Sequence, residues 1–496
     1  MRDGLAGATK ENMHADRKAV FPAIPRRPRL LLISYHFPPD PAIGSLRWQK
    51  LARFAAERGW GLDVVARDRA ELPVPDLERL EEIPPDTRIR GVLTVPLPVE
   101  RAVNAAWSLY RRVRPVRVPA PSPPGAANGG PAGPERRPLA PSTFRRDEVR
   151  YVSSARDAAR LYFAWLDFAR GNQWAVEAAR LGCALVEPGV HRAVISCGPP
   201  HSAHDAAVIV SRRAGLPLVV DMRDPWSLVQ RIPEHFASPL WFRLAERHER
   251  RAVDGAGLIV TNTELARDAM CAAHADASSR ILAVPNGFDD DPLPASRPRR
   301  QFVIAYAGTI YLDRDPRPLF RAAARVIRDL GLSPDAFTIE LMGDVSSHDG
   351  VPLEQLAREA GVEEYVRLRL PGSRREALEF LATATLLVLL PQDSDLAIPG
   401  KLFEYMRFDA WLMVLSTRES ATGALLRGSS VDVVAPDDID AMAELMLQRY
   451  RQHVEGVRPV AVASDDRFSR RVQADRLFTA IEALAGSPVP PFVPPD

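Results

Sequence analysis

Short apolar runs alternate with helical patterns along most of this chain, and this alternation restricts its fold more than any other feature. The first run, Arg29–Ser34, is almost continuously apolar, as expected of a strand that is buried on both faces. A loop, a helical pattern at Leu46–Glu57 and a second apolar run at residues 62–65 follow it. Because a strand, a helix and a strand in this order form the unit of a parallel sheet, we predict an α/β fold.

The alternation begins again after a charged, proline-bearing stretch at residues 289–300, where we place a domain boundary. Further strands of the first domain, residues 28–290, are predicted at residues 193–197, 218–220, 257–262 and 281–287. Strands of the second domain, residues 300–462, are predicted at residues 302–306, 337–341, 366–370, 386–390, 411–415 and 431–434. The sequence therefore predicts two doubly wound domains.

Length and charge limit the function classes that are open to this chain. With 496 residues it is too long for one compact domain. Its 65 Lys and Arg residues almost balance its 63 Asp and Glu residues, whereas a dedicated nucleic-acid binder carries a basic excess. The three cysteines have no metal-like spacing, and no apolar run approaches the ~20 residues that span a bilayer. We expect a cytoplasmic protein with a disordered tail at residues 1–27, which lacks the apolar core of a signal peptide.

A proline-rich stretch at about residues 114–150 interrupts the first domain. Its composition favours a flexible, partly polyproline insertion rather than a packed core. The arginines at its edges are interpreted as solvated, with contact to anionic lipid as the alternative. The helix predicted after it, residues 154–185, carries aromatic side chains at Tyr162, Phe163, Trp165, Phe168 and Trp174. Aromatic residues at helical spacing favour packing in the core over a membrane anchor.

The stretch at residues 398–405 has the residue types of an anion site. Pro399 suits the start of a helix, where free backbone N–H groups and the helix dipole attract an anion, and Gly400 permits close approach. Lys401 and Glu404 are three residues apart, so they share one helix face. This arrangement suits a nucleoside diphosphate, with the ammonium on phosphate and the carboxylate on the ribose hydroxyls. The alternative is an ordinary amphipathic helix with a salt bridge between the two side chains.

The order Pro399, Lys401, Glu404 and Tyr405 resembles the donor-site motif of glycosyltransferase family 4, in the branch that has a P-x-K-x-x-E-Y version. Family-like stretches also follow the strands of the first domain, at residues 37–47, 198–202, 221–226 and 284–287. The resemblance covers residues 29 to about 485, apart from the proline-rich insertion. It implies the GT-B architecture, in which two Rossmann-like domains face a central cleft. It also implies that a helix within residues 463–496 crosses back onto the first domain.

Strand ends of the first domain offer contacts to the sugar and the acceptor. His201 lies where an α/β sheet presents ligand contacts, and we expect it to hydrogen-bond the transferred sugar. Asp224 is expected to orient an acceptor hydroxyl or to anchor Arg223. Gly44 and Ser45, in the family-like glycine loop, are expected to face a phosphate or the acceptor. The alternatives are satisfied structural side chains and, for the glycine loop, a plain tight turn.

Departing pyrophosphate needs positive charge and preorganised donors, and the second domain offers candidates for both. These are the backbone at Gly308 and Thr309, with Lys401 and either Arg314 or Arg317. Family 4 commonly has an arginine directly after the glycine that corresponds to Gly308, and a lysine several residues later. In this chain Thr309 occupies the first position, and the two arginines lie near the second.

A second departure concerns the carboxylate that contacts the transferred sugar. The fuller family motif has another glutamate eight positions before the one that corresponds to Glu404, and Leu396 stands there in this chain. Asp393 and Asp395 are nearby substitutes, although their spacing differs from that of the family. This departure leaves the identity of the sugar open.

The resemblance implies a retaining hexosyltransferase that uses a nucleoside-diphosphate sugar and a glycan, lipid-linked or other hydroxyl acceptor, in cell-envelope or exopolysaccharide biosynthesis. It implies no cofactor and no metal, and we expect no nucleic-acid partner. Peripheral contact with the inner face of the plasma membrane remains an alternative to a purely cytoplasmic protein. A sugar-nucleotide epimerase of the same fold and a non-catalytic nucleotide-sugar-binding protein remain alternatives for the function. The motifs of serine hydrolases, P-loop nucleotide triphosphatases and dinucleotide-binding dehydrogenases are not found in the sequence.

Overall fold

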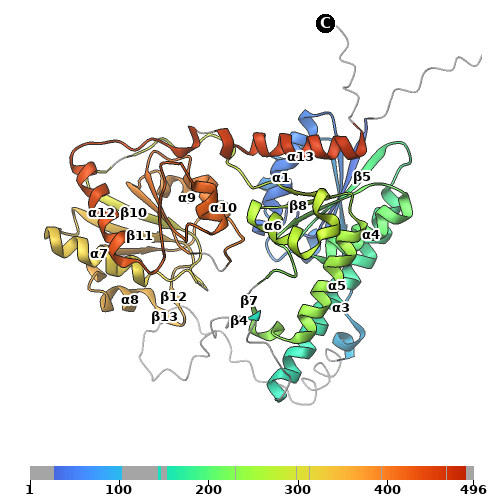
Figure 1. Cartoon of the computed structure of the whole chain (residues 1–496), viewed down its shortest axis with the longest axis horizontal. Coiled ribbons are helices and arrows are strands. Elements are labelled where there is room, and N and C mark those ends of the chain that lie inside the picture. Colours follow the sequence, from blue (N-terminus) through green and yellow to red (C-terminus); the bar gives the residue numbers. More distant parts are fainter. Residues whose placement is uncertain are drawn as a thin grey trace, which may run out of the picture.

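The computed structural model describes residues 27–102, 143–146, 154–229, 231–297, 299–311, 313–391, 394–464 and 466–486. It contains two parallel sheets, of seven and six strands, each with helices on both faces. This arrangement confirms the predicted α/β fold of two doubly wound units. Figure 1 shows the two sheets next to each other, with the C-terminal helix α13 (Arg470–Ala485) lying along the first of them.

The N-domain sheet has the strand order β3–β2–β1–β5–β6–β8–β9. Its strands are β1 (Arg29–Ser34), β2 (Gly61–Arg67), β3 (Thr87–Val92), β5 (His191–Cys197), β6 (Leu218–Arg223), β8 (Leu258–Thr261) and β9 (Ile281–Ala283). Alternate side chains of β1 enter different cores, with Leu30 and Leu32 on one face of the sheet and Leu31 and Ile33 on the other. Burial on both faces is what the continuous apolar run of this strand predicts.

Two groups of helices cover the N-domain sheet. α1 (Leu46–Glu57) and α13 cover one face, where the rings of Trp48 and Phe478 meet edge to face with centroids 6.4 Å apart. The other face is covered by α3 (Ala155–Leu185), α4 (Ser202–Ala214) and α5 (Pro239–Gly255), and α6 (Glu264–Ala273) lies beside β8 and β9. The C-terminal helix is therefore part of the N-domain core.

The C-domain sheet has the order β14–β11–β10–β15–β16–β17. Its strands are β10 (Phe302–Ala307), β11 (Phe337–Met342), β14 (Val366–Arg369), β15 (Leu386–Leu389), β16 (Trp411–Leu415) and β17 (Asp432–Val434). A short antiparallel pair, β12 (Ser347–His348) and β13 (Val351–Pro352), lies outside the sheet. Each strand of this sheet overlaps a predicted one and differs from it by one residue at most at either end.

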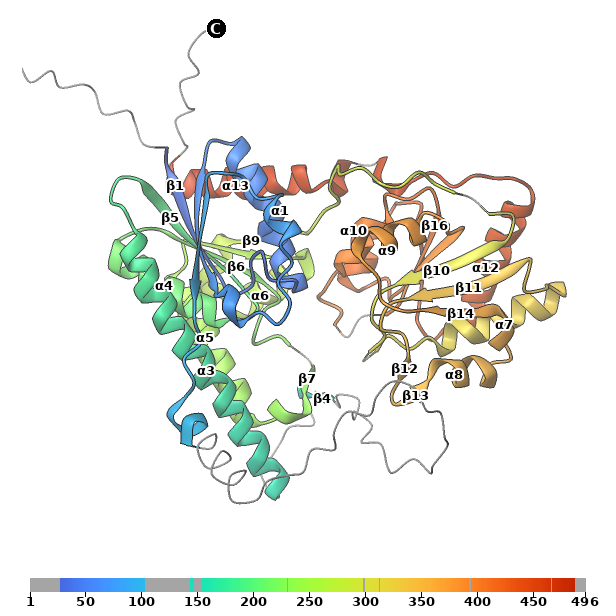
Figure 2. The same ribbon diagram turned by 180° about the vertical axis from the view of Figure 1, so that it is seen from behind.

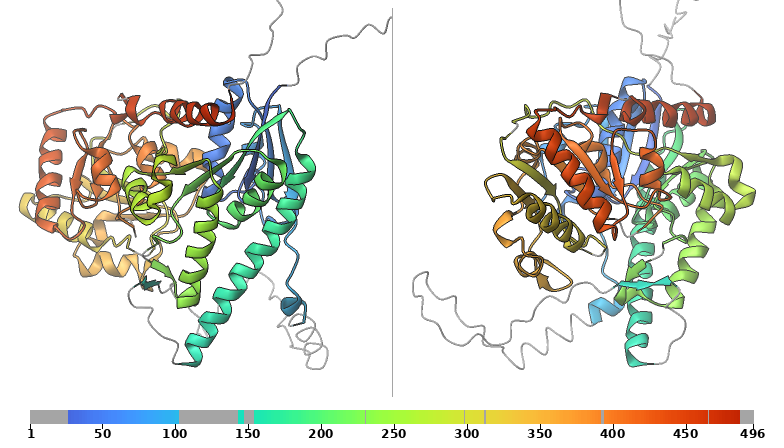
Figure 3. Two further views of the ribbon diagram at one scale, coloured as in Figure 1. Left: turned by 45° about the vertical axis from the view of Figure 1, so that its right-hand side comes forward. Right: turned by 60° about the vertical axis from the view of Figure 1, so that its left-hand side comes forward.

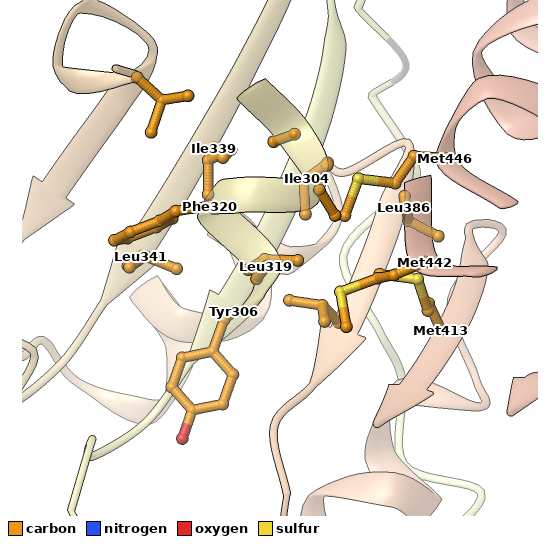
Figure 4. Close-up of a cluster of buried hydrophobic side chains, with 14 of the residues drawn as sticks. Ile304, Tyr306, Leu319, Phe320, Ile339, Leu341, Leu386, Met413, Met442 and Met446 are labelled. Carbon is orange, nitrogen blue, oxygen red and sulfur yellow. The ribbon is translucent and has the colours of Figure 1, made fainter. Parts of the chain in front are cut away.

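Helices cover both faces of the C-domain sheet as well. Its helices are α7 (Arg317–Leu330), α8 (Leu353–Glu359), α9 (Arg374–Leu381), α10 (Gly400–Tyr405), α11 (Ala421–Leu426) and α12 (Ile439–Val454). Figure 4 shows the core under α7 and α12, where Phe320 lies beside Ile339 and Leu341, and Met442 lies beside Met413. The opposite face packs against α9, α10 and α11. This packing fixes α10, which carries the predicted donor motif, beside the end of β15.

Two segments of the chain connect the domains, and they run side by side. Phe288, after β9, pairs in parallel with Ser469, before α13, through hydrogen bonds to the carbonyl of Phe468 and from the N–H of Arg470. A Cβ atom at Gly287 would lie 2.4 Å from the backbone nitrogen of Arg470. Glycine at this position therefore lets the two connecting segments approach within hydrogen-bonding distance.

In the region around α3, the structure leaves one prediction untested and corrects another. Most of the predicted insertion at residues 114–150 and almost all of the predicted tail at residues 1–27 lie outside the described residues, but β4 (Thr143–Arg145) pairs antiparallel with β7 (Arg231–Pro233). The predicted aromatic core of α3 is wrong for Tyr162, Phe163 and Trp165, which are 43%, 43% and 46% exposed. These residues belong to the N-terminal half of α3. Figure 3 shows that α3 and α5 project beyond the N-domain sheet. Among the described residues, no helix combines the length and hydropathy of a bilayer span.

Candidate functional site

A cleft of about 1140 Å³ is lined by both domains and contains most of the predicted site residues. Figure 2 shows the strand ends of the two sheets on the sides of the domains that face each other. The N-domain contributes residues that follow β1, β5 and β6, and the C-domain contributes residues that follow β10 and β15. Ligand contacts in α/β proteins gather at such carboxyl ends of parallel strands.

Lys401 is seated against the backbone of Gly308. Its Nζ atom donates a hydrogen bond to the hydroxyl of Tyr306 at 3.2 Å and lies 4.6 Å from the centre of that ring. A Cβ atom on residue 308 would lie only 1.4 Å from Nζ, and Gly308 has φ +152°, which favours glycine. A second glycine, Gly343, lies against it, and a Cβ there would lie 2.3 Å from the carbonyl oxygen of Gly308. Gly308 thus makes room for the ammonium group, and Gly343 makes room for the backbone of Gly308.

Burial lowers the pKa of Lys401 to about 7, with a further contribution from the charge of Arg314 and an opposing one from Glu404. Tyr306 stays protonated in the same range, because burial raises its pKa to about 12, and its hydroxyl donates to the carbonyl of Thr309 at 2.9 Å. Lys401 is therefore a cation at slightly acidic pH that loses its charge readily in the free protein. An anion beside it would restore that charge.

Glu404 lies on the same short helix, which begins after Pro399 as predicted. The alternative of a salt bridge with Lys401 is not what the structure shows, because Glu404 pairs with Arg374 of α9 at 3.0 Å and Lys401 bonds to Tyr306. The neighbouring Tyr405 is buried, and its hydroxyl accepts from the N–H of Ala307 at 2.8 Å. This bond ties α10 to the end of β10. It therefore holds Lys401 and Glu404 of α10 close to Gly308, which follows β10.

The structure distinguishes the two arginines that follow β10. Arg314 lines the cleft, donates to the carbonyl of Thr309 at 3.1 Å and lies over the ring of Tyr311 with its guanidinium carbon 4.3 Å from the centroid. Arg317 begins α7, where it pairs with Asp315 at 2.8 Å, and it is not among the residues that line the cleft. Arg314 is thus the arginine that accompanies Lys401 at the cleft, and Thr309 contributes an exposed side chain beside it.

Leu396 occupies the position of the family's other glutamate and lines the cleft. Its carbonyl accepts a hydrogen bond from the hydroxyl of Thr263 in the N-domain at 2.7 Å, so this loop reaches across to the other domain. Asp395 has an exposed side chain, and its carbonyl accepts from the N–H of Ala421. Asp393 lies outside the described residues. The described residues therefore offer Asp395, rather than an equivalent of the family glutamate, as the carboxylate of this loop.

Gly44 and Ser45 do not line the cleft in the described structure, although Ile43 and Leu46 beside them do. Ser45 is fully buried, and its hydroxyl donates within the loop and accepts from Arg79 at 2.7 Å. The carbonyl of Gly44 accepts from Arg223 at 3.3 Å. This arrangement fits the alternative of a tight turn, because the turn before α1 directs the serine hydroxyl inward.

The family-like stretches of the N-domain are joined by a buried ion pair. Arg47 of α1 donates to Asp221 at the end of β6 at 2.8 Å, and the indole N–H of Trp48 donates to the same oxygen at 2.8 Å. Arg47 also bonds to Asn286 at 3.0 Å, next to the connecting segments. These polar residues tie α1 to the ends of β6 and β9, and Arg47 and Asn286 line the cleft together with Arg223 and Asp224.

Arg223 has φ +56°, a conformation that costs energy for a residue with a side chain and that is typical of functional positions. This backbone bend ends β6 and directs both Arg223 and Asp224 to the cleft, which they line as predicted. Asp224 is half-buried and follows the arginine directly. Both residues line the cleft, and the guanidinium of Arg223 also donates to the carbonyl of Gly44.

His201 begins α4 and is stacked on Trp226, with ring centroids 4.4 Å apart and an interplanar angle of 28°. Burial, with the neighbouring His204 and Arg223, holds the pKa of His201 well below its usual value, so the ring is neutral at pH 7. His204 is 1% exposed and bonds to the hydroxyl of Ser196 at 2.8 Å. His201 lines the cleft and His204 lies behind it, which places only the first within reach of a ligand.

Comparisons with known proteins agree with this geometry. The D-inositol 3-phosphate glycosyltransferase of Mycobacterium sp. (strain KMS) is 30% identical over 201 residues, which is 37% of this chain and 44% of the relative. Anabaena HepE, solved in complex with UDP-glucose, superposes with a TM-score of 0.52 over 92% of this chain and 100% of that chain, at 13% identity. The lipopolysaccharide outer core galactosyltransferase WaaB superposes with a TM-score of 0.51 over 92% and 99% of the two chains, at 12% identity. The chain has the GT-B fold, and part of it is similar in sequence to a D-inositol 3-phosphate glycosyltransferase.

The sequence match spans less than half of the curated relative, and no protein-family model matches the chain. The likeness to the solved GT-B structures covers both domains, so the architecture that the resemblance implied is confirmed. Within the part of the chain that the structure describes, no group of three or more His, Cys, Asp and Glu side chains is arranged to hold a metal ion.

Several residues of this GT-B site were not found by sequence reasoning. Tyr306 and Arg374 are the hydrogen-bond and ion-pair partners of Lys401 and Glu404, and Trp226 is the ring under His201. Tyr306 was predicted only as part of a strand, because a tyrosine at the end of an apolar run indicates a core residue. Arg374 lies 30 residues before Glu404, and no local spacing connects the two.

Proposed function

We propose that this protein transfers a hexose from a nucleoside-diphosphate sugar to a hydroxyl group of an acceptor, with retention of the anomeric configuration. The observation that carries the proposal is the seat of Lys401 on Gly308, one helix turn from Glu404, at the cleft between two Rossmann-like domains. A cation in a close-fitting glycine seat beside a carboxylate on one helix face suits a diphosphate next to a ribose.

The proposed donor lies on the C-domain and the acceptor on the N-domain. Lys401 and Arg314 would stabilise the diphosphate as the bond from the anomeric carbon to the phosphate oxygen breaks. Glu404 would exchange Arg374 for the ribose hydroxyls. His201, neutral and held by Trp226, would hydrogen-bond the hexose, and the acceptor hydroxyl would bond to the anomeric carbon near Asp224 and pass its proton to the departing diphosphate.

Uridine diphosphate is the nucleotide that we propose, because HepE is described in complex with UDP-glucose and superposes over both domains. We further propose that cell-envelope or exopolysaccharide synthesis is the pathway, in agreement with the lipopolysaccharide galactosyltransferase WaaB of the same fold. The acceptor would reach the enzyme on the cytoplasmic side, at or near the inner face of the plasma membrane. Side chains supply the positive charge in this proposal, so we expect neither a cofactor nor a metal to be required.

Glu404→Gln is expected to weaken UDP binding by about tenfold, because the substitution keeps the shape and removes the charge that strengthens the hydrogen bonds from the ribose. Calorimetric titration of UDP and of uridine into both proteins measures the effect, which should be equal for the two ligands because both carry the ribose. Glu379→Gln is the matched control, since Glu379 is paired with Arg375 on neighbouring α9 and is not among the residues that line the cleft. Unchanged UDP affinity in Glu404→Gln would remove the donor site from this helix.

A non-catalytic nucleotide-sugar-binding protein is a second candidate, favoured by Thr309 and Leu396 at two positions where the family has charged residues. The test is the release of UDP from UDP-glucose with and without a panel of hydroxyl acceptors. Acceptor-dependent release supports the transferase, and binding without release above background supports the second candidate. Conversion of the sugar while it stays on the nucleotide, followed by nuclear magnetic resonance, would instead identify an epimerase.

A further inference from the structure

Part of the N-domain wall of the cleft, beside His201 and Asp224, is an apolar cluster, and Asp167, Arg170 and Asn172 of α3 line the cleft as well. Phe168 of α3 stacks on Trp226 with centroids 5.6 Å apart and an interplanar angle of 17°, and Trp241 of α5 meets Phe168 at 6.3 Å. Val229 and Ile232 line the cleft next to these rings. These rings and aliphatic side chains form one continuous cluster on the wall.

This apolar wall continues out of the cleft along α3. Phe236 lines the cleft and packs on the cluster of Phe168 and Trp241, and its ring lies 3.9 Å from that of His235. His235 in turn meets Phe163, with centroids 6.3 Å apart. Tyr162 contacts Phe163 at 5.7 Å and Trp165 at 6.1 Å. We call the series Trp226, Phe168, Phe236, Phe163, Tyr162 and Trp165 the aromatic track.

Cations beside the track already have partners. Arg146 donates to the carbonyl of Ser227 and pairs with Glu246, and Arg170 pairs with Glu100. Lys50, at the other side of the cleft, bonds to both Glu82 and Asp291 at 2.8 Å. A phosphate on this side would have to displace a carboxylate from one of these cations, whereas an uncharged group meets no such competition.

We propose that the aromatic track binds an aliphatic chain of the acceptor, so that the substrate is a glycolipid whose hydroxyl lies at Asp224 and whose chain leaves the cleft along α3. This inference rests on the proposed function and specifies its acceptor. From Phe168 to Tyr162 the helix rises about 9 Å, which gives the chain a contact that starts in the cleft and ends on the exposed surface. Exposed Tyr and Trp at the outer end suit the boundary between hydrocarbon and water.

An aliphatic chain fits the track better than a second sugar ring. A sugar on an aromatic face needs hydrogen-bond partners for its hydroxyls when water is removed. The aliphatic side chains of Leu228, Val229 and Ile232 beside the rings offer none. Polar partners are His201 and Asp224 at the inner end, and Asp167 and Asn172 on α3. The cleft therefore separates a polar place for the reacting hydroxyl from an apolar path for the rest of the acceptor.

The test compares methyl, hexyl and octyl β-D-glucoside as acceptor probes, bound to UDP-loaded protein below micelle concentrations and followed by nuclear magnetic resonance titration. Each methylene removed from water adds up to about fourfold in affinity, so octyl glucoside should bind at least tenfold more tightly than methyl glucoside. The double variant Phe163→Ser, Trp165→Ser should reduce this preference at least threefold and leave methyl glucoside and UDP unaffected. Leu370→Ser is the control, because Leu370 is 86% exposed on the C-domain, away from the track.

Equal affinities for the three glucosides in the wild-type protein would overturn the proposal, as would an equal loss in Leu370→Ser. Vesicles of phosphatidylcholine and phosphatidylglycerol are tested in parallel. If the double variant loses vesicle binding but keeps its preference for octyl glucoside, the track is a membrane contact and the proposal is wrong. UDP binding is measured separately from glucoside and vesicle binding. Failure of UDP to bind would contradict the proposed function and would leave the class of acceptor undecided.

Discussion

Gly308→Ala is expected to weaken UDP binding by about a hundredfold while the protein stays folded. The alanine Cβ would occupy the place of Lys401 Nζ, 1.4 Å away, and the flexible lysine would leave its seat and its bond to Tyr306. Loss of a charge-assisted contact to phosphate, worth roughly 1.5–3 kcal/mol, accounts for most of the effect. Calorimetric titration of UDP measures it, and uridine, which has no phosphate, should lose much less.

The control separates the lost seat from backbone strain. Gly331 has φ +59°, so alanine there is also strained, but no atom lies within 4 Å of its Cβ. Gly331→Ala should lower the melting temperature by a few degrees, as expected for a cost of about 1 kcal/mol, and leave UDP affinity unchanged. If the two glycine variants reduce UDP affinity equally, the reduction comes from strain in the C-domain, and Lys401 is not the phosphate ligand.

Affinity for UDP-glucose is expected to fall as pH rises above 7. The pKa of Lys401 is lowered to about 7 in the free protein, and a bound diphosphate raises it again. Below pH 7 the lysine is already protonated, so affinity is full and nearly constant. Above pH 7 binding must take up a proton, and affinity falls by up to tenfold per pH unit until the pKa of the complex is reached. The diphosphate of UDP-glucose does not titrate in this range, so the lysine is the source of the change.

Titrations at pH 6, 7, 8 and 9 in one buffer series check this expectation. Lys401→Arg supplies the control, because a guanidinium stays charged throughout and its affinity should be independent of pH. Proton uptake on binding, measured in buffers of different ionisation enthalpy, should appear at pH 8 in the wild type and not in the variant. An identical pH dependence in both proteins would assign the titration to another group.

The C-domain illustrates how much of the fold follows from sequence. Each of its strands is a short apolar run that is buried in a parallel sheet, so local composition suffices to place them. Edge strand β3 (Thr87–Val92) was missed in the N-domain, because it alternates Arg88, Ile89 and Arg90 and is half exposed rather than continuously apolar. The prediction that the aromatic residues of α3 pack in the core was wrong for another reason. A 31-residue helix is about 46 Å long and extends past the sheet that would bury it.

The sequence predicted the part of the candidate site whose residues lie close together in the chain. Lys401 and Glu404 share one short helix that begins directly after Pro399, and their spacing alone placed them together. Local spacing could not predict the direction of a side chain or its contacts with residues far away in the sequence. Ser45 has the same neighbours in sequence whether it faces the cleft or the core, and the structure directs it to Arg79. Likewise, the contact of Lys401 with Tyr306 joins residues 95 positions apart, which no local pattern encodes.

The paired connecting segments at Phe288 and Ser469 have a consequence for how this architecture can be recombined. Since α13 buries Leu477, Phe478 and Ile481 in the N-domain core, that domain is discontinuous, and the C-domain is an insert between β9 and α13. A fragment that stops at the linker would expose this apolar face to solvent. To exchange the C-domain between relatives, the chain must therefore be cut twice, once near Phe288 and once near Ser469. Because these two residues pair with each other, the exchanged C-domain would begin and end at the same place in the structure.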